Sequence, residues 1–212
     1  MNQKTKKIIL ILMLLLPVFA LGAWYPVNPR NGDMQTDGLL TYKAQQCHVA
    51  HYRWASPDAA AATAIASVTP ASTSARIITT GITNPDVARN LVMAAATSYS
   101  GVVDVTGTNI SGEVITEAFT LSGTSTTTGT KAFRTVTSFE VPANETLQLG
   151  TGEKLGLPYM SAYTTVFNTF LNNTIEGTAA AVTRDVDEIE KNTLDLNSSL
   201  NNTQVDVLFT WY

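Results

Sequence analysis

Two histidines and a cysteine stand close together near the start of the chain, at Cys47, His48 and His51, and they are the first candidates for chemistry. On a helix, His48 and His51 would share one face and could ligate a metal ion, while a thiol beside a histidine can act as a nucleophile. The surrounding residues favour a strand, in which these neighbouring side chains diverge. No Asp or Glu lies close by either. We therefore expect no metal site here, and we expect Cys47 to be a small buried apolar residue.

The one acidic cluster consists of Asp185, Asp187, Glu188 and Glu190, which fall within six residues. A calcium-binding loop needs a glycine and a terminal Glu at fixed positions, and this segment lacks both at the needed spacing. The sequence therefore predicts a solvated charged face at this position.

Common catalytic signatures do not occur in the sequence. There is no glycine-rich phosphate loop followed by Lys and Ser/Thr, no Gly-x-Ser-x-Gly and no His-Glu-x-x-His. The sequence therefore favours the hypothesis of a non-enzymatic protein with no catalytic, cofactor-binding or metal site and no cofactor.

The composition limits the classes of partner. Charged residues make up 14% of the 212 residues, well below the roughly 25% of an average soluble domain. The net charge is −4 and no basic run follows residue 7, which argues against nucleic acid because phosphate binding needs clustered Lys and Arg. The single cysteine excludes an intramolecular disulfide. Stability must therefore come from packing or from subunit contacts.

The N-terminus has the form of a secretory signal. Three lysines at positions 4, 6 and 7 precede an apolar run over residues 8–23 that ends in small residues. The run contains Pro17 and is shorter than the about 20 residues of a membrane-spanning helix. A cleaved signal, membrane contact through residues 8–23 and an apolar arm packed in an assembly all remain open. Met34 is a possible alternative start, with the preceding residues lying upstream of the true reading frame.

Residues 101–160 organise the rest of the chain. Short β-branched and aromatic runs alternate with Gly, Asn, Ser and Pro at intervals of roughly 8–12 residues, as in an all-β sandwich or barrel. Residues 131–141 show the strand period best. The predicted shared face there consists of Phe133, Thr135, Thr137, Phe139 and Val141.

These patterns predict a mainly β protein, with an antiparallel β-sandwich or jelly-roll-like domain and an extended N-terminal arm. The domains are expected at 1–23 (signal-like segment), 24–75 (arm and Ala/Ser/Thr-rich region) and 76–212 (sandwich with a C-terminal strand).

The expected elements outside the central stretch follow from the same patterns. We expect an extended arm over 24–40, strands over 40–54, 76–80, 89–97 and 164–171, one or two helical turns or a surface loop within 56–75, and a helix or loop over 185–200.

The chain closes with an apolar run over 204–212. Val205, Val207, Phe209 and Trp211 share one face of this predicted strand. Such a strand must be covered by a sheet or by a neighbouring subunit, because an exposed flat edge would aggregate. A symmetric oligomer would supply that cover and close the open strand edges.

Several stretches resemble a class of virion proteins of tailed bacteriophages, similar to the head decoration or cement proteins that accompany a major capsid protein. The resemblance covers roughly residues 76–212 and rests on composition and order. The stretches that carry it are 84–91, 105–109, 112–119, 129–137, 152–159 and 192–200.

The resemblance implies a β-rich homotrimer bound to the outside of a capsid, with the major capsid protein as its partner and the virion surface as its location. The signal-like N-terminus departs from that pattern. The alternative hypothesis is an exported or membrane-tethered β-sandwich on the cell surface that binds carbohydrate or a host surface.

Overall fold

The computed structural model describes residues 33–36, 40–43, 48–68, 73–158 and 165–211, with side chains described from Val49 to Thr210. The signal-like segment 1–23, most of the predicted arm and Cys47 lie outside the described residues. The chain divides into two compact units, residues 1–47 with residue 212, and residues 48–211. In the described part of the first unit, β1 (Asp33–Thr36) pairs antiparallel with β2 (Leu40–Lys43).

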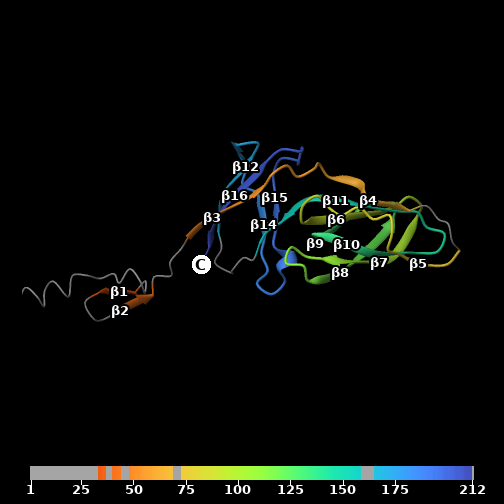
Figure 1. Cartoon of the computed structure of the whole chain (residues 1–212), viewed down its shortest axis with the longest axis horizontal. Coiled ribbons are helices and arrows are strands. Elements are labelled where there is room, and N and C mark those ends of the chain that lie inside the picture. Colours follow the sequence, from red (N-terminus) through yellow and green to blue (C-terminus); the bar gives the residue numbers. More distant parts are fainter. Residues whose placement is uncertain (1–32, 37–39, 44–47, 69–72, 159–164, 212) are drawn as a thin grey trace, which may run out of the picture. The chain divides into compact units, whose positions relative to one another are not determined.

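The second unit contains an antiparallel β-sandwich (Figure 1). The first of its two sheets, here called the threonine sheet, has the strand order β5-β10-β7-β8. The second, the central sheet, has the order β14-β15-β11-β6-β9, with β4 also paired to β11.

The strands of the threonine sheet are β5 (Arg76–Ile78), β7 (Tyr99–Thr108), β8 (Val114–Gly123) and β10 (Thr135–Val141). Those of the central sheet are β4 (Ala61–Val68), β6 (Arg89–Ala95), β9 (Thr127–Phe133), β11 (Leu147–Gly156), β14 (Ala181–Thr183) and β15 (Thr193–Asp195).

The two sheets enclose an apolar core because their strands alternate buried and exposed residues. In β7, Val103 and Val105 are fully buried, whereas the alternating residues Val102 and Asp104 are exposed. Phe119 from β8, Phe139 from β10 and the leucines of β6 and β11 complete the same core. A period of two along each strand therefore places one face of each sheet inside.

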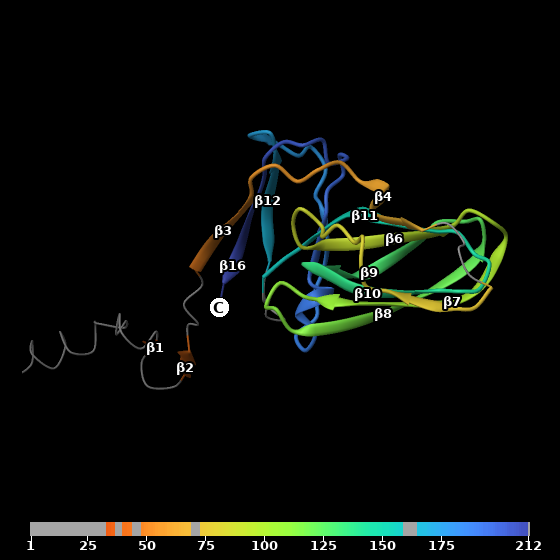
Figure 2. The same ribbon diagram turned by 45° about the vertical axis from the view of Figure 1, so that its right-hand side comes forward.

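A third sheet, the C-terminal sheet, lies at one end of the sandwich (Figure 2). Its strand order is β13-β12-β16-β3, and the strands are β3 (His48–Trp54), β12 (Val166–Leu171), β13 (Thr174–Ile175) and β16 (Val205–Trp211). Asn172 and Asn173 join β12 to β13 with φ of 51° and 59°. Positive φ at both central residues is the geometry of a two-residue hairpin turn that Asn tolerates.

The C-terminal sheet covers a second apolar core. Val205, Val207 and Phe209 of β16 are buried, as are Leu155 and Leu157 at the far end of β11. Val205, Val207 and Phe209 are thus covered within the chain, by their own sheet and by the end of the central sheet, while the side chain of Trp211 lies outside the described residues. The prediction that the C-terminal strand needs cover is confirmed for these three residues, and this cover does not require a neighbouring subunit.

Strand β11 takes part in both cores. One of its edges pairs with β6, and the other pairs first with β4 and then with β15. The register with β4 shifts between Leu149 and Thr151, so Gly150 lies at a bulge. A Cβ at Gly150 would lie 2.1 Å from the carbonyl oxygen of Ala61. Only glycine therefore lets β4 approach β11 this closely.

The mainly β, antiparallel fold that the sequence predicts is confirmed, and residues 101–160 do form successive strands. The prediction for residues 56–75 was wrong, because residues 61–68 form strand β4. Alanine favours helix intrinsically, but here the partner strand decides: pairing with β11 and burial of Ile65 and Ala66 outweigh the local propensity. No helix in the described part of the chain is long and apolar enough to cross a membrane.

Residues 131–141 do not form one strand. The chain changes sheet at Arg134, so β9 ends at Phe133 and β10 begins at Thr135. A bulge between Val136 and Ser138 then turns Val136 inward and leaves Thr137 exposed. The predicted shared face was therefore wrong for the two threonines, since a single extra residue reverses the alternation.

Three other segments differ in detail from their prediction. The stretch 40–54 forms two strands, of which β3 pairs with β16 in the C-terminal sheet and with neither sandwich sheet. Part of the predicted arm, residues 33–36, forms a hairpin strand. The helix-or-loop segment 185–200 contains a short 3-10 helix, η1 (Ile189–Lys191), and strand β15.

We predict that Gly150→Ala destabilises the protein by about 1–3 kcal/mol, because the added methyl group must push apart the backbones of β4 and β11. Urea unfolding of the full chain measures the loss. Gly177→Ala is the matched control, since a Cβ there meets no atom within 4 Å. Equal stability of the two variants would contradict the role given to Gly150.

Candidate functional site

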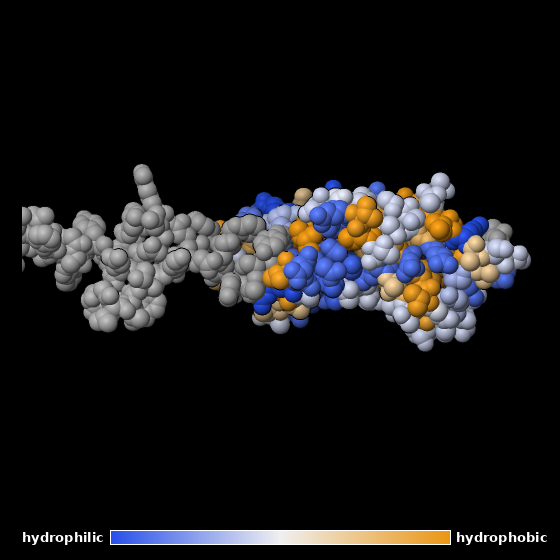
Figure 3. All heavy atoms as spheres, turned by 90° about the horizontal axis from the view of Figure 1, so that it is seen from below, coloured by the Kyte–Doolittle hydropathy of each residue, from blue (hydrophilic) through white to orange (hydrophobic). Residues whose placement is uncertain are grey.

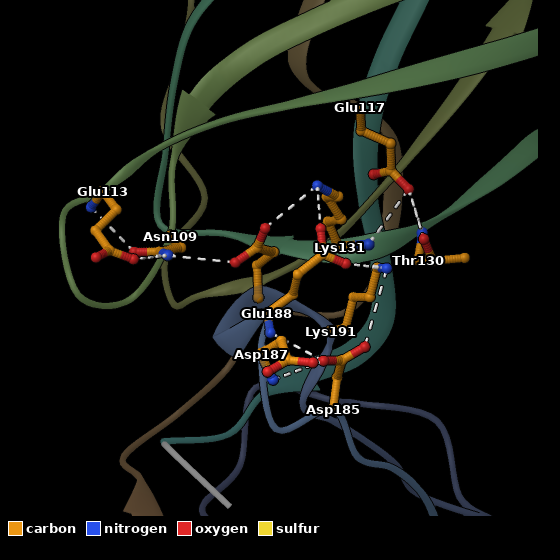
Figure 4. Close-up of polar contacts among 10 residues, drawn as sticks. Asn109, Glu113, Glu117, Thr130, Lys131, Asp185, Asp187, Glu188 and Lys191 are labelled. Atoms are coloured by element: carbon orange, nitrogen blue, oxygen red, sulfur yellow. Dashed lines mark hydrogen bonds and ion pairs between the residues drawn. The ribbon is translucent and has the colours of Figure 1, made fainter.

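The acidic cluster singled out in the sequence packs against the sandwich and is the more extensive of two polar clusters (Figure 4). Helix η1 lies beside β9, and Lys131 of β9 contacts Glu190 of this helix and Glu188, which precedes it. The Lys131 Nζ is 3.2 Å from Oε1 of Glu190 and 3.5 Å from Oε1 of Glu188. Residues some sixty positions apart in sequence are therefore joined by charge.

Glu190 is buried, with 7% of its surface exposed. One carboxylate oxygen faces Lys131, and the other accepts a hydrogen bond from the buried Asn109 amide at 3.4 Å. Asn109 in turn donates to Glu113 and accepts from the backbone of the same loop. The prediction of a solvated face is thus wrong for Glu190, which braces the C-terminal segment against the sandwich.

The rest of the cluster forms a more exposed turn. One oxygen of Asp185 accepts the backbone N–H groups of Glu188 and Asp187, each at 2.9 Å, and these bonds hold the pKa of Asp185 below its ordinary value. Lys191 lies close to Glu188, so the pKa of Glu188 is lowered and that of Lys191 is raised. The carboxylates of Asp185 and Glu188 are thus engaged in keeping the turn closed.

Glu117 closes the seam between the sandwich sheets. Its Oε1 accepts the backbone N–H of Thr130 at 2.6 Å and that of Lys131 at 3.3 Å. Strand β8 belongs to the threonine sheet and β9 to the central sheet. The Glu117 side chain thus accepts backbone N–H groups of β9 that a neighbouring strand would otherwise bind. Gly129 makes room for it, since a Cβ there would lie 2.6 Å from Oε2 of Glu117.

A buried arginine, Arg89, binds the segment that precedes β4. Arg89 is fully buried and donates from Nε to the carbonyl of Gly152 at 2.8 Å and from Nη1 to the carbonyl of Asp58 at 2.8 Å. Its Nη1 also pairs with Asp86 at 3.2 Å. Because a buried cation must have its donors satisfied, these contacts fix three segments around one side chain.

The second polar cluster lies on the outer face of the C-terminal sheet and surrounds Asp206 of β16. Oδ1 of Asp206 is 2.7 Å from Nε of Arg53 and 2.5 Å from Nε2 of His51, both from the neighbouring strand β3. Oδ2 accepts from Gln204. Burial by itself would raise the pKa of Asp206, but the hydrogen bonds from Arg53, Gln204 and His51 outweigh it and leave the pKa lowered.

A shallow hollow of about 370 Å³ opens beside this cluster. Its walls are His51, Arg53, Phe170, Asn173, Asp206 and Leu208. The arrangement combines an aromatic ring and an aliphatic side chain with polar groups that are held in place by a buried carboxylate. Such a combination can bind a small ligand that has one apolar face and one polar edge.

Of the residues considered as candidates for chemistry in the sequence, His51 lies in a polar cluster, but the described residues form no metal site. Residues 48–54 form a strand as expected, and His51 is half-exposed on the outer face. Among the described residues, no group of three or more His, Cys, Asp or Glu side chains is arranged to hold a metal ion.

Sequence reasoning missed Asp206, Arg53 and Glu117. One signal for Asp206 was available, because a carboxylate between Val205 and Val207 in an apolar strand needs a partner. That partner lies 153 residues away in sequence, so only the pairing of β3 with β16 reveals it.

Comparison of the chain with protein-family models, with curated proteins and with solved structures finds no match.

We predict that Lys131→Met lowers the free energy of unfolding by about 3 kcal/mol, because it leaves the buried Glu190 without its cation. Urea unfolding of the full chain measures this change. Lys191→Met, at the exposed end of the same network, is the control and is expected to cost much less, because solvent screens exposed ion pairs. If the two variants lose the same stability, Glu190 is not the brace described here.

The lowered pKa of Asp206 predicts a specific dependence of stability on pH. Its ionised form is favoured in the folded state, so its contribution is complete above about pH 5 and is lost as the pH falls through the lowered folded pKa. The difference in unfolding free energy between wild type and Asp206→Asn should therefore shrink as the pH falls from 5 to below 3.8, the ordinary value. Denaturant unfolding across this range measures the difference, and a constant difference would contradict the prediction.

Proposed function

We propose that this protein is a non-enzymatic virion structural protein that binds and stabilises a bacteriophage capsid, with the outer face of the threonine sheet against the major capsid protein. The observation that carries the proposal is the composition of that face. The sequence resemblance over residues 76–212 supplies the class of partner.

Three large apolar side chains on this sheet are exposed to solvent: Ile77 is 69% exposed, Val102 56% and Val114 76%. Around them, hydroxyl groups bond across the strands, with Thr106 3.2 Å from Thr116. Most of the other outward-facing side chains are short threonines and serines. A flat face of β-branched and small residues loses little side-chain entropy when a partner covers it.

On three strands of this sheet the exposed charge has one sign. Strands β7, β8 and β10 contain no Lys or Arg, whereas the edge strand β5 begins with Arg76. Asp104 and Glu140 are exposed on this face, and no residue that the structure describes pairs with either. A partner that presents Lys or Arg would neutralise both carboxylates, whereas a second copy of the same face would oppose like charges.

The face of the protein drawn in Figure 3 has a mixed polarity, which fits a partner that binds after this protein has folded. In Figure 3, apolar residues stand in separate groups between polar ones and do not merge into one continuous patch. Such a surface keeps the free protein soluble and still offers apolar anchors within a polar surround, as non-obligate interfaces do.

The same proposal assigns the protein to the capsid surface as a homotrimer. The number three rests on the resemblance alone. Because the C-terminal strand is covered within the chain, the trimer contacts belong to other surfaces. Light scattering of the full chain measures the oligomeric state directly.

We predict that Asp104→Lys weakens binding to capsid shells at least tenfold, because it places a cation against a basic partner surface. Shells assembled from the major capsid protein encoded in the same genome are mixed with the full chain and sedimented through sucrose. Wild type should co-sediment in a fixed ratio to the capsid protein. Asp187→Lys makes the same charge change in an exposed turn and should leave binding unchanged.

Two results would overturn this proposal. One is wild-type protein that stays in solution at saturating shell concentration. The other is Asp104→Lys binding as tightly as wild type while its thermal unfolding is unaltered.

A further inference from the structure

We propose that the hollow on the outer face of the C-terminal sheet is a binding site for an acidic sugar residue, a pyranose that carries a carboxylate. The site lies on a different sheet from the proposed capsid-binding face and does not depend on that function. Its parts are the charged cluster around Asp206 and the apolar side chains beside it.

The strand register places these groups in two adjacent rows across the sheet. In the first row, Ile175, Phe170, Asp206 and Arg53 follow one another on β13, β12, β16 and β3. In the second row, Leu208 is flanked by Asn168 and His51. Since neighbouring strands lie about 4.8 Å apart, the row from Ile175 to Arg53 spans roughly 14 Å. The apolar half and the charged half of the hollow are therefore adjacent.

In the charged half, the buried Asp206 fixes the positions of Arg53 and His51. Asp206 has 8% of its side chain exposed, while Arg53 and His51 have 52% and 48% exposed. Asp206 engages only Nε of Arg53, and no hydrogen bond within the described residues uses the two terminal nitrogens. An arginine fixed at Nε presents those nitrogens as a planar pair of donors, which is the geometry that a carboxylate accepts.

His51 adds an acceptor to the same half. Its Nε2 lies 2.5 Å from the Asp206 carboxylate, so in the neutral ring Nε2 carries the proton. Nδ1 then has a free lone pair for a sugar hydroxyl. Asn173, whose Oδ1 is taken by Gln204, offers its amide N–H groups from the turn at the other side.

The apolar half suits one face of a pyranose ring. Phe170 and Leu208 line the hollow, and Ile175 beside Phe170 is 54% exposed. The C–H groups on one face of a sugar stack on an aromatic ring, while its hydroxyls point sideways to donors and acceptors. The hollow is shallow, which fits a flat ring better than an acyl chain.

The charge balance disfavours a ligand with two negative charges. Arg53 and Asp206 offset one another, so with the neutral His51 described above the cluster is close to neutral. A phosphate dianion would face the Asp206 carboxylate without enough compensation. A pyranose with a single carboxylate, which pairs with Arg53 while the ring hydroxyls pair with His51 and Asn173, matches the groups present.

The experiment uses the full chain labelled with ¹⁵N and ¹³C, titrated with D-galacturonic acid, its linear tetramer, D-galactose and acetate, and followed by NMR. We expect the monomer to bind with a millimolar Kd and D-galactose and acetate at least tenfold more weakly. Tighter binding of the tetramer would assign the site to a polysaccharide, and equal binding would assign it to a single terminal residue. Failure of both acids to bind at 20 mM would overturn the proposal.

Substitutions locate the site. Arg53→Lys keeps the cation beside Asp206 but removes the pair of terminal donors, and it should weaken galacturonate binding at least tenfold. Arg134→Lys, an exposed arginine between β9 and β10 that contacts the Asp86 carbonyl, is the matched control and should bind as wild type does.

The outcome stays decisive if Arg53→Lys does not fold. In wild type, shift changes confined to the six residues that line the hollow support the site, and changes centred elsewhere refute it. Full galacturonate affinity in folded Arg53→Lys would also refute it.

Discussion

The structure of residues 48–211 depends on one strand that is shared by two apolar cores. The first half of β11 places Leu147 and Leu149 in the sandwich, and its end places Leu155 in the core under the C-terminal sheet. A strand buried on both faces and paired along both edges has no room for a side chain where a neighbour crosses it. Gly150 and Gly152 occupy such positions, one against β4 and one against the Asn90 side chain. Close packing of this strand therefore couples the stability of the two cores.

Where the hydrogen bonding between strands is interrupted, polar side chains bind the backbone groups that are left without a strand partner. The register of β6 shifts on both sides near Asn90, whose amide donates to the carbonyl of Gly129 while its oxygen accepts from the N–H of Lys154. Glu117 does the same for the seam between the sheets, and Arg89 for the entry to β4. Buried backbone groups must find partners, and at these three places one side chain supplies them. Two of the three, Glu117 and Arg89, belong to the small set of charged residues in the chain.

The β class followed from periodicity and composition, because turn residues and β-branched runs act locally. What escaped prediction depends on distant contacts. The Ala-rich residues of β4 have helical propensity and become a strand only because β11 offers an edge. The alternation through 131–141 looked continuous, yet the chain changes sheet at Arg134 and a bulge follows. The polar clusters were missed for the same reason: Lys131 and Asp206 are ordinary residues in sequence, and their partners lie about 60 and more than 150 positions away.

The pairing of β3 with β16 also constrains the order in which the parts of the protein can fold during synthesis. Residues 48–54 leave the ribosome early, but the strand that pairs with them, residues 205–211, is synthesised after every other described element. Until then β3 has no strand partner, and the core under the C-terminal sheet lacks Val205, Val207 and Phe209. The sandwich can form before residues 205–211 are synthesised, whereas the C-terminal sheet closes only after them, and closing a loop of this length is a slow, entropically costly step. A chain interrupted before residue 205 would present an open strand edge to other chains.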